Sequence, residues 1–280
     1  MSQVPIYFIN LDRSPDRAAF MQAGLKAQGL WGQSHRVNAI DAKADDYRDA
    51  FYRNLASRCW SLNPSLAACT ESHRRAWSMF LETDDEIALF LEDDVVFAPR
   101  FAETLQEIVQ NASEFECIKI DGNPFRMRVG PPIACGRTSL RALLGVTFSS
   151  AAYLLTRQGA KRMLQDTERY NLAIDLEKFR PRSGWRMFVS DPSICVQGML
   201  INAVEGSELP EEILASIRHD NASWHDDPGP EPAWWTLKNK VQRQLTQKLP
   251  DALWRKRRLV KSGGGIQKIP LQDSFAPFRW

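Results

Sequence analysis

Short apolar runs that alternate with amphipathic segments restrict the fold of this 280-residue chain more than any other feature. Each run is rich in β-forming residues and too short for a helix, which is typical of buried strands. We expect strands at 5–11, 35–40, 87–91, 115–120 and 146–155, and a short strand pair at 187–196. Strands separated by helices predict an α/β fold, with a mostly parallel sheet that helices cover on both faces.

The segments between the strands carry helix start signals. Ser14-Pro15 and Asn63-Pro64 each place a capping residue before a proline at the first helical position, and Thr156 caps a further segment. The expected helices are 15–29, 64–82, 99–110 and 157–165. Residues 122–142 show little periodicity and predict a long functional loop. A second loop is expected around Asp175 and Glu177.

Polar residues follow the expected strands at four places. These are Asn10-Leu11-Asp12-Arg13, Glu92-Asp93-Asp94, Asp121 and the loop that carries Asp175. In open α/β sheets, ligands bind beyond the carboxyl ends of the strands. The four features together therefore predict one binding site at this edge of the sheet.

The acidic triplet Glu92-Asp93-Asp94 allows three interpretations. In the first, Glu92 and Asp94 face the site together, since alternate strand residues point the same way, and they bind a hard cation that bridges to a diphosphate. In the second, the acids belong to a Mg²⁺-dependent phosphohydrolase, although Asn10-Leu11-Asp12 is a poor match to its nucleophile position. In the third, they are solvated turn residues that cap the helix starting near Pro99.

Composition restricts the class of protein. A content of 44% hydrophobic and 25% charged residues is ordinary for a soluble globular chain. No apolar stretch approaches the roughly 20 residues that cross a bilayer, and the first residues lack the basic and apolar regions of a secretory signal. The five cysteines are odd in number and include no Cys-x-x-Cys pair, which favours reduced thiols in a cytoplasmic protein.

Charge divides the chain into an acidic body and a basic end. Residues 236–280 hold eleven basic and two acidic residues, a net of +9, which leaves −7 for the remainder. We expect a catalytic domain at 1–225 and an extension at 226–280, made of a Pro-rich linker (226–232) and a basic amphipathic helix (233–248). Residues 233–261 suit an anionic membrane surface better than nucleic acid, because tryptophan and leucine share one face. A plain packed helix is the alternative.

Several motifs, taken in order along the chain, resemble glycosyltransferase family 25, the lipooligosaccharide-type galactosyltransferases related to collagen galactosyltransferase domains. The resemblance covers roughly residues 4–200. Its motifs are Phe8-Ile9-Asn10-Leu11-Asp12-Arg13-Ser14, Arg36-Val37-Asn38-Ala39-Ile40-Asp41, Cys69-x-x-Ser72-His73-Arg74, Leu91-Glu92-Asp93-Asp94-Val95 and Ala152-Tyr153-Leu154-Leu155-Thr156. The segment 64–73 and the loop around Asp175 depart from the family pattern.

The resemblance implies a fold, a reaction and a cofactor. The fold would be of the GT-A (Rossmann-like) type with a mixed, mostly parallel sheet and, in this chain, the basic C-terminal helical extension. The reaction would transfer a hexose, galactose or a related one, from a UDP-sugar with inversion. Mn²⁺ or Mg²⁺ would lie at Glu92 and Asp94. The acceptor would be a lipooligosaccharide, lipopolysaccharide or other surface glycan, reached from the inner face of the cytoplasmic membrane.

Roles follow for the remaining polar residues. Asp175 matches the family's acid and is expected to take the proton of the acceptor hydroxyl, with Asp121 as the second candidate. We expect the donor to meet Asn10, Leu11, Arg13, Arg17, Arg74 and Asp93. His73 lies on an apolar helical stripe and is interpreted as a core histidine. Phe125, Phe179 and Trp185 are expected either to stack on sugar or to pack.

Two alternatives to this function stay open. One is the phosphohydrolase, which would release phosphate with no sugar nucleotide present. The other is a degenerate transferase that binds glycans or serves as a scaffold and shows no metal-dependent transfer.

Overall fold

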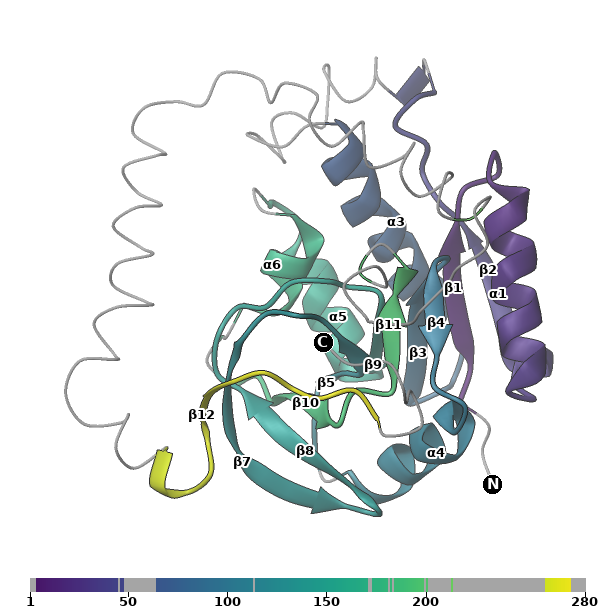
Figure 1. The fold of residues 1–280 in the computed structure, drawn as a ribbon. Coiled ribbons are helices and arrows are strands. Elements are labelled where there is room, and N and C mark those ends of the chain that lie inside the picture. The colour runs from purple at the N-terminus through teal and green to yellow at the C-terminus, as the bar shows by residue number, and fades with distance from the viewer. Residues whose placement is uncertain are drawn as a thin grey trace.

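A nine-stranded sheet with helices on both faces forms the body of the computed structural model (Figure 1). The structure describes residues 4–44, 46–47, 64–112, 114–170, 173–180, 182, 184–198, 200, 213 and 260–272. None of the helices in these ranges is long and apolar enough to cross a membrane. Four of the five cysteines lie in them, and all four are free thiols: Cys69, Cys117, Cys135 and Cys195.

The large sheet has the order β12-β7-β8-β10-β5-β9-β3-β1-β2. Its strands are β1 (Ile6–Asn10), β2 (Ser34–Asn38), β3 (Ile87–Glu92), β5 (Cys117–Lys119), β7 (Met127–Cys135), β8 (Thr138–Leu143), β9 (Ala152–Thr156), β10 (Met187–Asp191) and β12 (Gly265–Gln267). The pairings make β1, β2, β3, β5, β7 and β10 point one way and β8, β9 and β12 the other. The predicted α/β class with a mixed, mostly parallel sheet is confirmed.

The helices cover the two faces of this sheet because both faces of its central strands are apolar. The helices are α1 (Pro15–Ala27), α3 (Pro64–Leu81), α4 (Phe101–Asn111), α5 (Arg157–Asp166) and α6 (Ile174–Lys178), with a 3₁₀ turn η1 (Trp31–Gln33). Tyr7 and Ile9 of β1 lie in one core cluster with side chains of α3 and α5. Ile6 and Phe8 lie in a second cluster with side chains of α1 and α4. Successive residues therefore enter opposite cores, as a strand requires.

A second, three-stranded sheet follows the acidic triplet. It has the order β4-β11-β6, with β4 (Val95–Phe97), β6 (Asp121–Gly122) and β11 (Cys195–Gln197). The strand pair expected at 187–196 is therefore divided between the two sheets, with β10 in the large sheet and β11 in the small one. This small sheet connects the chain after β3, the chain after β5 and the chain after β10, so it holds three strand ends together.

The predicted long loop at 122–142 is wrong. Strands β7 and β8 form an antiparallel hairpin there, with Gly136 in the turn at φ 61°. Pro131 and Pro132 lie within β7, and prolines normally indicate that a segment is not a strand. The register shifts between Val129 and Pro132, and β12 pairs only with Met127–Val129, so the prolines lie at a bulge and an unpaired edge. A strand tolerates proline at these positions.

The loop expected around Asp175 is also wrong, because residues 174–178 form the short helix α6. The helix starts are predicted correctly: Pro15 and Pro64 begin α1 and α3, and the Thr156 hydroxyl accepts the Gly159 amide at the start of α5.

Part of the C-terminal region returns to the sheet. Strand β12 pairs with β7, and Ile269 is buried in the core cluster that faces α3 and α5. The predicted linker at 226–232 and the predicted helix at 233–248 lie outside the described residues. The boundary at residue 225 stays a prediction.

Candidate active site

The carboxyl ends of β1 and β3 place the first group of polar residues side by side. The two strands are parallel, with Ile9 opposite Glu92. The Asn10 side chain donates to Asp93 at 2.7 Å, and an Arg17 nitrogen lies 3.1 Å from the other Asp93 oxygen. All three side chains are buried. The charge of Asp93 is thus balanced inside the protein by Arg17, which the first turn of α1 supplies.

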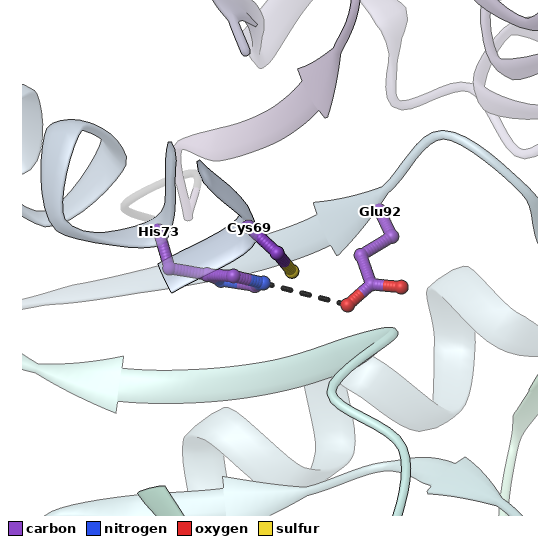
Figure 2. Close-up of side chains that lie close together, drawn as sticks. All are labelled: Cys69, His73 and Glu92. Atoms are coloured by element: carbon purple, nitrogen blue, oxygen red, sulfur yellow. Dashed lines mark hydrogen bonds and ion pairs between the residues drawn. The ribbon is translucent and has the colours of Figure 1, made fainter. Parts of the chain in front are cut away.

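Glu92 is held differently, by uncharged donors. The Ser150 hydroxyl donates to Oε1 at 2.5 Å and the Gln197 amide donates to Oε2 at 2.8 Å. His73 Nε2 lies 3.4 Å from Oε1 (Figure 2). Burial raises the pKa of Glu92, but the hydrogen bonds from His73 and Ser150, together with the electrostatic effects of His73 and Lys178, outweigh burial and lower the pKa below its ordinary value. The carboxylate form is therefore favoured.

A chain of hydrogen bonds determines the proton positions on His73. Trp77 Nε1 donates to the Tyr153 hydroxyl at 2.8 Å, and that hydroxyl lies 2.9 Å from His73 Nδ1. Because ionised Glu92 only accepts, Nε2 carries the hydrogen and Nδ1 accepts from Tyr153. Burial lowers the pKa of His73, so the ring is neutral. The expected core histidine is confirmed as buried, and it also orients Glu92.

Cys69, His73 and Glu92 could together hold a metal ion. One possible ligand atom of each lies within 4.8 Å of the others (Figure 2). Cys69 and His73 are four residues apart on α3, so they share a face of the helix. However, a metal at His73 Nε2 would have to replace the hydrogen that this atom donates to Glu92, and burial raises the pKa of the Cys69 thiol. The arrangement favours a hydrogen-bonded support for Glu92.

The third acid of the triplet, Asp94, is buried beside the small sheet. Its carbonyl accepts the Gly198 amide at 2.7 Å, one residue after the Gln197 that bonds Glu92. Glu92 and Asp94 are thus both attached to the end of β11, whereas Asp93 is attached to β1 and α1.

Ser149 connects the two candidates for the catalytic base. Its hydroxyl donates to Asp121 at 2.5 Å, and its backbone amide donates to Asp175 at 3.2 Å. Ser149 has φ 69°, a conformation that costs a non-glycine residue about 1–3 kcal/mol and recurs at functional sites. Since Ser150 bonds Glu92, two adjacent serines join all three carboxylates.

Asp121 and Asp175 differ in charge environment. Asp121 is fully buried and lies 2.5 Å from the Lys119 ammonium, which is also fully buried. Asp175 is partly exposed and accepts two backbone amides, those of Ser149 and Leu176. Burial raises the pKa of both carboxyls. Asp175 is therefore the more accessible of the two candidates, and Asp121 is committed to an ion pair.

Lys178 is a buried base that the sequence analysis missed. It lies three residues after Asp175, on the same face of α6. Its Nζ is 3.3 Å from the centre of the Tyr153 ring and has no hydrogen-bond partner among the described residues. Burial lowers its pKa to about 7, although the charges of Glu92 and Asp121 favour the ammonium form. No local signal marks it, because a lysine after Glu177 normally indicates a solvated helix.

Two of the remaining predicted donor residues, Arg13 and Arg74, bond to groups outside the acidic triplet. Arg13 pairs with Asp41 at 2.7 Å. Arg74 donates to the Leu164 carbonyl and the Thr167 hydroxyl at the end of α5, so the structure does not bring it to the acids. Leu11 is partly exposed after β1.

The three aromatic residues predicted for the site differ in burial. Phe179 is fully buried. Trp185 is partly buried between Arg162 and Arg182, whose guanidinium carbons lie 4.8 and 5.6 Å from its ring centre. Packing therefore accounts for these two rings. Phe125 is 50% exposed, so it alone of the three is available to a ligand.

Comparison with known proteins identifies relatives of the chain. Residues 3–127 match glycosyltransferase family 25 (LPS biosynthesis protein). A "Glycosyltransferase 25 family member" of Drosophila pseudoobscura pseudoobscura is 26% identical over 170 residues, and one of Drosophila melanogaster is 22% identical over 176. Each alignment covers 57% of this chain. The chain spans about a quarter of the length of these relatives, 26% and 27%.

Solved structures that are similar to this chain include a glycosyltransferase involved in the glycosylation of the major capsid of PBCV-1. It is 11% identical, with a TM-score of 0.42, over 79% of this chain and 100% of that one.

Proposed function

We propose that this chain, whose residues 3–127 match glycosyltransferase family 25, transfers a hexose from a UDP-sugar to a glycan with inversion. The observation that supports this most is the way Ser149 and Ser150 join two groups of carboxylates. Ser150 bonds Glu92, and Ser149 bonds Asp121 and Asp175. Transfer needs one group for the leaving diphosphate and another for the acceptor hydroxyl, on separate elements. Family membership supports galactose or a related hexose as the sugar.

The first group suits a hard divalent cation. Glu92 and Asp94 supply carboxylate oxygens, which Mn²⁺ and Mg²⁺ prefer. Within the described part of the chain, the donors to Glu92 are uncharged, and no arginine pairs with it as Arg17 pairs with Asp93. Such an ion, when bound, offsets charge on the leaving diphosphate. His73, Ser150 and Gln197 fix the orientation of Glu92 before the donor arrives.

The second group contains the base. Asp175 accepts the proton of the acceptor hydroxyl while that oxygen attacks the anomeric carbon. Its raised pKa makes it more basic than an exposed aspartate, and its partial exposure lets an acceptor reach it. Lys119 holds Asp121 in an ion pair, which suits a role in binding the donor sugar rather than in moving a proton.

Lys178 supplies positive charge when the diphosphate leaves. Burial keeps its pKa near 7, so the approach of a phosphate anion favours the ammonium. The donor binds next to a buried hydrogen-bonded group made of Asn10, Arg17 and Asp93.

Calorimetric titration with UDP, with and without Mn²⁺, tests the donor assignment. We expect Mn²⁺ to strengthen UDP binding in the wild type and to have no effect on UDP binding in an Asp94→Asn variant. The assignment is wrong if Mn²⁺ fails to strengthen binding, or if the variant binds as the wild type does.

We propose that the acceptor is a lipooligosaccharide-type glycolipid at the inner face of the cytoplasmic membrane, approached through residues 233–261. The net charge of +9 over residues 236–280 supports this. Removal of residues 233–261 should abolish binding to anionic phosphatidylglycerol vesicles. Vesicle binding that survives the deletion contradicts the proposal.

A further inference from the structure

Two exposed aromatic residues lie close in the chain to residues of the site, Phe125 to Asp121 and Phe148 to Ser149. Phe125 is 50% exposed and Phe148 is 49% exposed, and their ring centres are 5.3 Å apart at an interplanar angle of 55°. They are the only aromatic residues among the large hydrophobic side chains that are exposed in the described ranges. We call these two rings the aromatic platform.

A buried asparagine joins the two loops that carry the platform. Asn123 is fully buried, and its amide donates to the Phe148 carbonyl at 3.0 Å and to the Thr147 hydroxyl at 3.3 Å. Its side-chain oxygen accepts the Phe125 amide at 3.0 Å. The Asn123 side chain therefore fixes the backbone of Phe125 and the backbone of Phe148 relative to each other.

The platform is attached directly to the proposed base. Phe148 immediately precedes Ser149, whose amide bonds Asp175 and whose hydroxyl bonds Asp121. Asn123 follows Asp121 by two residues. The nucleotide side of the site, at Asn10, Arg17 and Asp93, is formed by other elements, β1, α1 and the end of β3.

We propose that the aromatic platform binds a pyranose ring of the acceptor glycan and presents its hydroxyl to Asp175, an inference that rests on the proposed function. A pyranose has an apolar face of C–H groups and a polar rim of hydroxyls. The exposed faces of Phe125 and Phe148 match the first, and carboxylates match the second. A ring held by stacking needs no charged side chain, so the platform selects the sugar face rather than a particular substituent.

Saturation-transfer NMR on the full chain tests this without any donor. The probes are methyl β-glucopyranoside, methyl β-galactopyranoside and methyl α-mannopyranoside. We expect saturation on the C–H protons of one pyranose face for at least one of them. Phe125→Leu and Phe148→Leu should each weaken the binding severalfold, and the double variant about tenfold, the ratio that corresponds to 1.4 kcal/mol. Phe148→Tyr should retain it.

Ile133→Ala is the matched control, because Ile133 is 46% exposed on the β7–β8 hairpin. Absence of binding by all three probes, or equal binding by the double Leu variant, overturns the proposal. UDP binding with Mn²⁺ is measured on the same variants and should be unchanged. If the wild type does not bind UDP, the proposed function is contradicted. If the wild type binds UDP but none of the three pyranosides, only the platform is contradicted.

Discussion

Asp93 and Asp175 lie in the same site, but the protein treats their charges in opposite ways. Asp93 is buried against Arg17 and Asn10, with each of its oxygens bonded. Asp175 accepts only backbone amides, and nearby Lys178 has no hydrogen-bond partner among the described residues. The first arrangement is complete within the protein. The second holds a carboxyl and an amine whose pKa values are both perturbed, and such groups cluster at functional sites.

The largest effect should come from Asp94, which we propose as a metal ligand. We expect Asp94→Asn to lower kcat by about 10³-fold with Mn²⁺ and a UDP-hexose, because charge stabilisation of the leaving group is the largest single contribution in such sites. Steady-state kinetics measures it. Asp84→Asn, an exposed acid before the start of β3, is the control and should have wild-type kcat. Equal rates in the two variants contradict the metal assignment.

The next effect concerns the stability that the buried Arg17–Asp93 pair provides. Arg17→Met should lower the free energy of unfolding by about 3 kcal/mol, because it leaves the Asp93 carboxylate buried without its counter-ion. Urea denaturation measures this. Arg100→Met is the control, since Arg100 pairs with Glu103 on the surface at 2.9 Å and should cost less than about 1 kcal/mol. A cost for Arg17→Met no larger than that of the control would show that the buried pair is not structural.

Asp175→Asn tests the proposed catalytic base. We expect kcat to fall about 10²-fold, the usual contribution of a general base, with UDP binding retained. The base acts as a carboxylate, and burial raises its pKa above 3.8. The kcat/KM of the wild type should therefore fall as pH falls through that raised pKa, and the variant should lack this acid limb. If Asp121→Asn removes the limb instead, the two aspartates exchange roles.

The smallest effect is a gain in stability from Lys178→Met. In the folded protein the pKa of Lys178 is about 7, below its ordinary 10.5. Between these values the unfolded chain binds more protons, so wild-type stability rises with pH. At pH 7 the variant should be more stable by about 2 kcal/mol, since each pKa unit corresponds to about 1.4 kcal/mol and methionine loses the contact with Tyr153.

Urea denaturation at pH 7 and pH 9 checks this prediction. The difference between variant and wild type should shrink at the higher pH. Lys161→Met, on the exposed face of α5, should change stability by less than about 0.5 kcal/mol. A destabilised Lys178→Met variant at pH 7 would show that the ammonium is satisfied in the fold.

Most of the fold is predictable from the sequence because the signals that mark it are local. Apolar runs, cap-proline starts and the break at the acidic triplet each depend on a few neighbouring residues. The structure differs from the prediction where local signals conflict with long-range strand pairing. Pro131 and Pro132 indicate a loop, yet pairing with β8 keeps the segment in a strand.

The candidate site was predicted in outline for the same reason. Strand ends and the family resemblance pointed to Glu92, Asp94, Asp121 and Asp175 from their own surroundings. The direction of β9 was not readable. Because β9 runs antiparallel to β3, its amino end lies at the carboxyl end of β3, and this brings Ser149 and Ser150 to the acids.

The sequence by itself determined the strands that precede the acids, β1, β3 and β5, and that acids follow them, since periodicity and motif order are properties of neighbouring residues. Only the tertiary structure decided which acid is neutralised. Arg17 and Asp93 are 76 positions apart, and Lys178 of α6 contacts the ring of Tyr153 on β9. Whether a charge is paired or left for a ligand depends on such contacts, because burial and distance are properties of the folded chain.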